Sequence, residues 1–127
     1  MVKFSKSEIL MGRTAEQDLT PQQANNLTAL VDRLNNLFKD FTGPVKVSSG
    51  YRRPADNLKA KGAKASHHME CAAADLQDTT GLVWSYCMDN LQRCEELGLW
   101  LEAREATPTW VHLQIYPPRS GRRIFKP

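Results

Sequence analysis

Three residues of this sequence have the chemistry to bind one metal ion together. His68 and Asp75 lie seven positions apart with small residues before the acid, and His112 lies far downstream in a strand-like segment. Zinc binds imidazole nitrogen and carboxylate oxygen at about 2.0–2.2 Å, and a structural zinc is usually closed by four protein ligands, mostly cysteines. Two imidazoles and one carboxylate leave a coordination position open. The three residues therefore predict a catalytic metal site, although either histidine alone would be interpreted as a hydrogen-bonded turn or strand residue.

The overall composition excludes several other classes of protein. A chain of 127 residues with 41% hydrophobic and 24% charged residues is normal for one globular domain. No apolar run approaches the ~20 residues that are needed to span a bilayer. The net charge of +3 suits an anionic polymer such as a cell wall, but it falls short of a nucleic-acid-binding signature. We expect one monomeric domain over residues 1–127 that binds neither nucleic acid nor a membrane.

The cysteines and the first residues of the chain bear on its location and chemistry. Three cysteines without a CxxC spacing argue against a disulfide framework and a zinc finger. Cys87 and Cys94 fall on the apolar stripe of a predicted helix, so we expect both to be small buried hydrophobic residues. Residues 1–6 lack the apolar stretch of a secretory signal. We therefore expect synthesis in the cytoplasm without a signal peptide.

The elements that would position the three residues alternate between helix and strand. The first helix is predicted to begin at Thr20, with Pro21 at its first position and Gln23 completing a capping box, and to stop near Gly43. The remaining expectations are short strands at 45–48 and 72–76, a basic mobile loop at 55–65, a helix at 81–97, a hairpin of 99–102 with 110–115, and a solvated basic tail at 117–127. This order predicts an α+β domain, a small antiparallel sheet with flanking helices.

Three motifs resemble those of a known enzyme family. They are Ser66-x-His68-x-x-Cys71-x-Ala73-x-Asp75, Ser49-Gly50-Tyr51-Arg52-x-Pro54 and Trp110-Val111-His112. In this order they resemble the M15 zinc peptidases, the D-Ala-D-Ala carboxypeptidase and peptidoglycan endopeptidase group that shares its fold with the hedgehog signalling domain. The resemblance spans nearly the whole chain, is strongest to the short phage-type members, and implies a hedgehog/DD-peptidase-like fold.

The resemblance also implies roles for individual residues. His68, Asp75 and His112 would be the zinc ligands. Arg52 would hold a carbonyl or carboxylate of the substrate, because a guanidinium binds planar oxygen pairs in a fork, and Tyr51 would line the substrate groove.

The first motif departs from the family pattern at one position. Cys71 replaces the family's glycine, so a turn with positive φ would be strained there. A thiolate ligand from Cys71 is a second interpretation, since soft sulfur suits zinc. His67 lies one residue off the pattern, and we expect it to be exposed.

Hydrolysis also requires a general base for the attacking water. Several family members place an acid three residues before the last histidine, but that residue is Thr109 here. The candidates that remain are Glu102, Glu105 and Glu70. If even-numbered residues of the hairpin pair with even-numbered ones, Glu102 shares a face with His112, and Glu105 lies in the loop. The short members of the family carry a glutamate that matches Glu102, which we favour.

The sequence therefore predicts a zinc peptidase that cuts a bond next to a D-amino acid in the peptidoglycan stem peptide. Carboxypeptidase and endopeptidase activity both stay open. A phage enzyme of this kind, such as an endolysin, would act in wall lysis or remodelling and reach the wall through lysis machinery or on the virion. The alternative is a zinc-containing binding module without turnover on the same fold. Cys71 and Thr109 favour the module, and Glu102 favours the enzyme.

Overall fold

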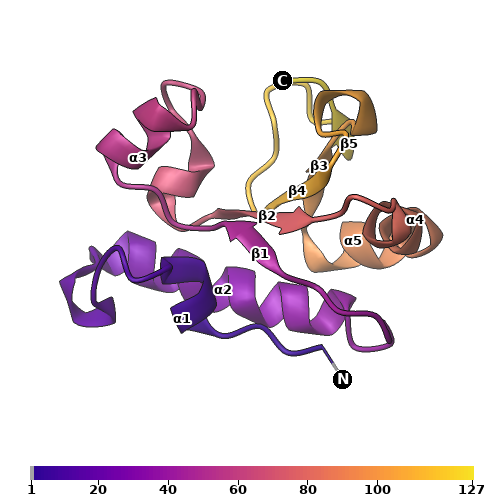
Figure 1. Ribbon diagram of the computed structural model, residues 1–127, viewed down its shortest axis with the longest axis horizontal. Coiled ribbons are helices and arrows are strands. Elements are labelled where there is room, and N and C mark those ends of the chain that lie inside the picture. The colour runs from indigo at the N-terminus through magenta and orange to yellow at the C-terminus, as the bar shows by residue number, and fades with distance from the viewer. Residues whose placement is uncertain (1) are drawn as a thin grey trace.

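The computed structural model describes residues 2–127, over which five α-helices surround one five-stranded sheet (Figure 1). The strand order is β1-β2-β4-β3-β5. The α-helices are α1 (Lys6–Leu10), α2 (Pro21–Leu37), α3 (Pro54–Lys59), α4 (Leu82–Asp89) and α5 (Leu91–Leu97). The strands are β1 (Val47–Ser49), β2 (Ala73–Gln77), β3 (Trp100–Glu102), β4 (Trp110–Gln114) and β5 (Ile124–Phe125), and short 3-10 helices lie at η1 (Glu16–Asp18), η2 (His67–Glu70) and η3 (Arg104–Ala106). The predicted α+β class is confirmed.

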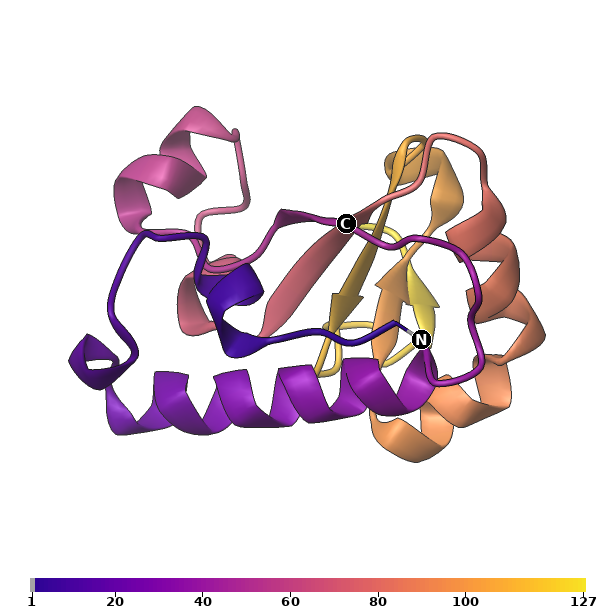
Figure 2. The same ribbon diagram turned by 60° about the horizontal axis from the view of Figure 1, so that its bottom comes forward.

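The long helix α2 supports the sheet from one side, as Figure 2 shows. Its predicted capping box is confirmed, because the Thr20 side chain accepts from the Gln23 N–H and the Gln23 side chain accepts from the Thr20 N–H. The helix ends at Leu37, earlier than predicted, with Phe38 as its C-cap. Its inner side buries Leu27, Leu30, Leu34 and Leu37 completely. Burying each of these leucines stabilises the fold by about 1.5–3 kcal/mol relative to leaving it exposed to water. Packing of α2 therefore contributes strongly to the stability of the sheet.

The sheet has one apolar face and one face that carries the candidate ligands. In β2 and β4 the register pairs Asp75 with His112 and Leu76 with Val111. Successive strand side chains point to opposite faces, so the register places the acid and the histidine side by side on one face. The other face is fully buried in the core through Ala74, Leu76, Leu101, Val111 and Leu113.

Two segments in the middle of the chain differ from their predicted structure. Residues 55–65 are not one loop, because α3 occupies their first part. Pro54 stands in the first turn of this helix, and the Asp56 carboxylate accepts from the Arg53 N–H, which together start it. The predicted helix at 81–97 is two helices that meet at Asn90, whose side chain donates to the Tyr86 carbonyl. Asparagine competes with the helix for backbone groups, which explains the break.

The C-terminal tail was predicted to be a solvated terminus, but part of it enters the sheet. Strand β5 pairs with β3 in parallel, so the sheet is not wholly antiparallel. The N–H groups of Leu101 and Ala103 donate to the carbonyls of Arg123 and Phe125. The outer edge of β3 carries backbone groups that need partners, and two residues of β5 are too few to produce a recognisable strand pattern. This pairing buries Phe125 beside the candidate site.

Candidate metal centre

His68, Asp75 and His112 converge at one point of the sheet. Each offers a ligand atom, these atoms lie within 4.8 Å of one another, and all three residues are buried. Asp75 Oδ1 is 3.3 Å from His68 Nε2 and 2.9 Å from His112 Nδ1. Within residues 2–127 this is the single cluster of its kind. The donor set of two imidazoles and one carboxylate fits zinc with one position left open.

Backbone contacts fix the orientation of the His68 ring. The Ser66 side chain caps η2 by accepting from the His68 N–H. Nδ1 of His68 lies 2.8 Å from the Gly50 carbonyl oxygen, to which it donates, so Nε2 keeps its lone pair on the side of Asp75. Gly50 has to be glycine, because a Cβ there would lie 2.2 Å from the Ile9 carbonyl oxygen. The close approach of α1 therefore explains the glycine in the second motif.

Electrostatic contacts keep Asp75 charged inside the protein. Burial on its own raises the pKa of this carboxyl, but hydrogen bonds from His112 and His68 outweigh it and hold the pKa well below its usual range. Burial likewise lowers the pKa of His112, yet the Asp75 carboxylate turns the net shift upward. A buried carboxylate between two imidazoles is a strongly attractive position for a cation.

Arg52 lies next to this cluster and its side chain is only 12% exposed. Nη2 donates to Asp75 Oδ2 at 3.3 Å, Nε donates to Ser49 Oγ, and Nη1 donates to Asn57 Oδ1. Three of its five N–H donors are thus bound within the protein. Its neighbour Tyr51 is half-buried and packs against the core.

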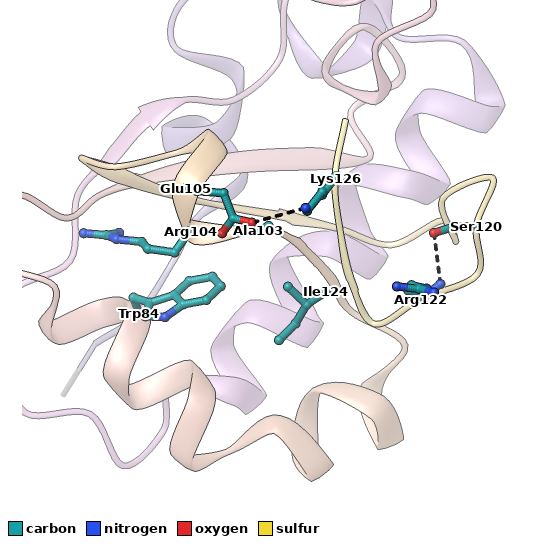
Figure 3. Close-up of a pocket in the computed structure, with 8 residues that line it drawn as sticks. All are labelled: Trp84, Ala103, Arg104, Glu105, Ser120, Arg122, Ile124 and Lys126. Carbon is teal, nitrogen blue, oxygen red and sulfur yellow. Dashed lines mark hydrogen bonds and ion pairs between the residues drawn. The ribbon is translucent and has the colours of Figure 1, made fainter.

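The three candidate general bases occupy different surroundings. The β3–β4 register pairs Trp100 with Gln114 and Leu101 with Leu113, so Glu102 lies on the same face of the sheet as His112. Glu102 Oε1 accordingly lies 4.0 Å from His112 Nε2, with 23% of its side chain exposed. Glu105 instead lines a cavity of about 520 Å³ between α4, η3 and the tail, where it faces Lys126 (Figure 3). Glu70 is exposed and pairs with His67. Of the three, only Glu102 contacts the cluster.

Cys71 has the left-handed conformation that its glycine-like position suggested, with φ of 59°. Its side chain is fully buried in the hydrophobic core. Burial raises the pKa of the Cys71 thiol to about 11, which disfavours a thiolate ligand. The prediction that His67 is exposed was wrong, because its ring is half-buried beside Tyr116, 5.4 Å between centroids.

Sequence reasoning missed two contributors to this region. Gln114 is buried, and its Oε1 lies 2.8 Å from His112 Nε2; its position two residues after a strand histidine was the available signal. Asp78 accepts from the N–H groups of Val83 and Trp84 at the start of α4 and binds Arg104. This network joins the end of β2 to α4 and η3.

An open cleft of about 560 Å³ reaches the cluster at Asp75. Its walls come from the segment after α1, from β1, and from the ends of β2 and β4; they include Met11, Lys46, Ser48, Gln77, Thr79, Thr109 and Trp110. A buried donor set at the wall of an open cleft is suited to act on a bound ligand.

The donor set has the chemistry to hold a catalytic metal ion, and the cleft beside Asp75 can admit a ligand. The model of the family Peptidase M15 matches residues 2–113, and the chain belongs to this family. Neither the curated proteins nor the solved structures gave a match. No helix among residues 2–127 has the length and apolar character to cross a membrane.

Proposed function

We propose that this protein is a zinc-dependent peptidase that cuts a bond next to a D-amino acid in the stem peptide of peptidoglycan. The observation that carries the proposal is the buried cluster of His68, Asp75 and His112 at the wall of an open cleft. The bond preference rests on the resemblance of the motifs to the wall-cutting members of the family. A lytic role for a phage-encoded enzyme follows from the same resemblance.

Each residue near the cluster has a defined task in this proposal. Zinc bound there would lower the pKa of a water ligand to about 7 and polarise the scissile carbonyl. The Glu102 carboxylate accepts a proton from the attacking water and returns it to the leaving amine. Arg52 keeps two N–H donors beyond its internal bonds, and these orient the substrate's oxygen atoms.

The cleft also suits an acidic peptide. Lys46 stands exposed at its rim and supplies positive charge for a carboxylate of the stem peptide. Trp110 offers an amphipathic surface to the peptide backbone. The cleft is open rather than enclosed, and both endopeptidase and carboxypeptidase action are compatible with it.

One observation supports a binding module as the second candidate. The contact of Glu102 is with Nε2 of His112, whereas Nδ1 is the nitrogen that faces Asp75. In such a module, the Glu102 carboxylate on that side of the ring would hold the histidine in place. A zinc-containing module that binds wall peptides without cutting them would need no general base.

Digestion of purified peptidoglycan separates the two candidates. We expect zinc-loaded wild type to release peptides identified by mass, and chelation to abolish release. Glu102→Gln should lower the rate by about 10²–10⁴-fold, while Glu95→Gln, a change on the exposed side of α5, should leave it unchanged. Undiminished cleavage by Glu102→Gln would remove the residue from its role. No cleavage by zinc-loaded wild type on several wall types would favour the binding module.

A further inference from the structure

Gln114 connects His112 to a fixed point of the backbone. It is the last residue of β4 and lies two positions after His112, so both side chains belong to the same face of the sheet. Its side chain is buried, and both ends of its amide are bound: Nε2 donates to the Tyr116 carbonyl oxygen at 2.8 Å, and Oε1 lies 2.8 Å from His112 Nε2.

We propose that Gln114 is a positioning residue that selects the nitrogen through which His112 binds the metal. The Tyr116 carbonyl accepts hydrogen bonds only, so the amide NH₂ of Gln114 must face it. The amide oxygen must then face the imidazole, and this oxygen is also an acceptor only. Nε2 of His112 therefore carries the proton of that hydrogen bond.

This arrangement leaves Nδ1 of His112 as the metal-binding nitrogen. Nδ1 lies 2.9 Å from Asp75 Oδ1, on the side where His68 Nε2 also converges. The two histidines are thus held in the same way through opposite nitrogens, His68 by the Gly50 carbonyl and His112 by Gln114. Only the second of these partners is a side chain, so only it can be removed by mutation. Gln114 also lies just beyond the residues that the family model matches.

A second contact reinforces this orientation. The Phe125 ring packs edge-on against His112, with centroids 6.2 Å apart and planes at 86°. It restricts rotation of the imidazole but offers no hydrogen-bond partner. Packing therefore limits the ring plane, while Gln114 decides which nitrogen is protonated. Outer partners of metal-binding histidines typically change metal affinity by about 10–100-fold.

The role rests on the metal site of the proposed function, so zinc binding is measured directly rather than through catalysis. Zinc affinity is determined by competition with a chelator for wild type, for Gln114→Met and for the exposed control Gln92→Met. Methionine conserves the volume of Gln114 and replaces the strong amide acceptor with a thioether that accepts only weakly. We expect Gln114→Met to bind zinc 10–100-fold more weakly and Gln92→Met to match wild type. Thermal unfolding of the chelated proteins measures the purely structural effect of each substitution.

Nitrogen NMR of zinc-loaded wild type tests the tautomer without any substitution. We expect His112 to show a zinc-bound Nδ1 and a protonated Nε2 whose proton exchanges slowly, and the Nε2 proton of Gln114→Met to exchange rapidly. Zinc bound through Nε2 in wild type overturns the proposal even if the variant does not fold. So does wild-type zinc affinity in a folded Gln114→Met. Failure of wild type to bind zinc overturns the metal site itself, and a wall-binding protein that holds zinc but does not cut leaves the role of Gln114 intact.

Discussion

Replacing Arg52 with methionine should lower the free energy of unfolding of the chelated protein and raise the affinity of the protein for zinc. Arg52 Nη2 and Asp75 Oδ2 are 3.3 Å apart, and the two side chains are 12% and 9% exposed. At an effective dielectric constant of about 20, two unit charges at that distance attract by roughly 5 kcal/mol. The cost of burying the guanidinium offsets part of this attraction. Because breaking a buried pair leaves an uncompensated charge, it costs about 3–5 kcal/mol.

The lower end of that range applies to Arg52→Met, since His68 and His112 still contact Asp75. We expect the free energy of unfolding of the chelated protein to fall by about 3 kcal/mol. With zinc bound, the ion neutralises Asp75, and the loss should shrink to about 1 kcal/mol, the value of an ordinary hydrogen bond. Unfolding and zinc binding form a closed thermodynamic cycle, so the difference of about 2 kcal/mol between the two losses must equal the change in the free energy of zinc binding. The variant should therefore bind zinc roughly thirtyfold more tightly.

Denaturant unfolding measures the loss of unfolding free energy, once with chelator and once with saturating zinc. Chelator competition measures the change in zinc affinity. Arg53→Met is the matched control, because Arg53 pairs with Asp56 at the surface and should affect neither stability nor zinc binding measurably. Equal or weaker zinc binding by Arg52→Met would refute the reasoning. That result would mean that Arg52 orients the Asp75 carboxylate for metal binding and does not compete with the metal for the negative charge of Asp75.

Three further substitutions or titrations test other parts of the structure. Gly50→Ala places a Cβ against the backbone of Ile9 and should destabilise the protein by about 3 kcal/mol; Gly43→Ala meets only a side chain and should cost less, as denaturant unfolding will show. The Cys71 thiol should resist a thiol reagent at pH 8 and react once the chain unfolds. Its pKa of about 11 in the fold, against 9.0 ordinarily, means that stability present below pH 9 is lost as the pH rises toward 11, which unfolding curves at several pH values will detect. Lys46→Glu should lower kcat/KM on an acidic stem peptide about fivefold, the effect of a rim charge of at most ~1 kcal/mol, without changing zinc affinity; an unchanged kcat/KM would place the peptide carboxylates elsewhere.

Local rules predicted the elements whose signals are contained in a few neighbouring residues. The capping box of Thr20 and Gln23 is confirmed because both partners lie within one helical turn. The hairpin has the even–even register that the choice of Glu102 required, since Trp100 pairs with Gln114 and Leu101 with Leu113. The break at Asn90 was missed, since the flanking apolar residues keep helical spacing across it.

In the candidate site too, some features could be predicted from the sequence and others depended on the tertiary structure. The types and spacing of His68 and Asp75 were sufficient to nominate a metal site, because ligand chemistry depends on residue type. The choice of Glu102 over Glu105 as general base depended on an assumed strand register and on the family resemblance, because strand pairing decides which of the two carboxylates lies beside His112.

The sequence by itself determined the donor set, the residues that start α2, and the family to which the motifs point. Only the tertiary structure decided that Gln114 and Phe125 surround His112, that Arg52 binds Asp75, and that part of the tail joins the sheet. These contacts join residues whose local patterns carry no signal for one another. Strand pairing and burial bring them together, and the need of buried polar groups for partners then fixes which atoms meet.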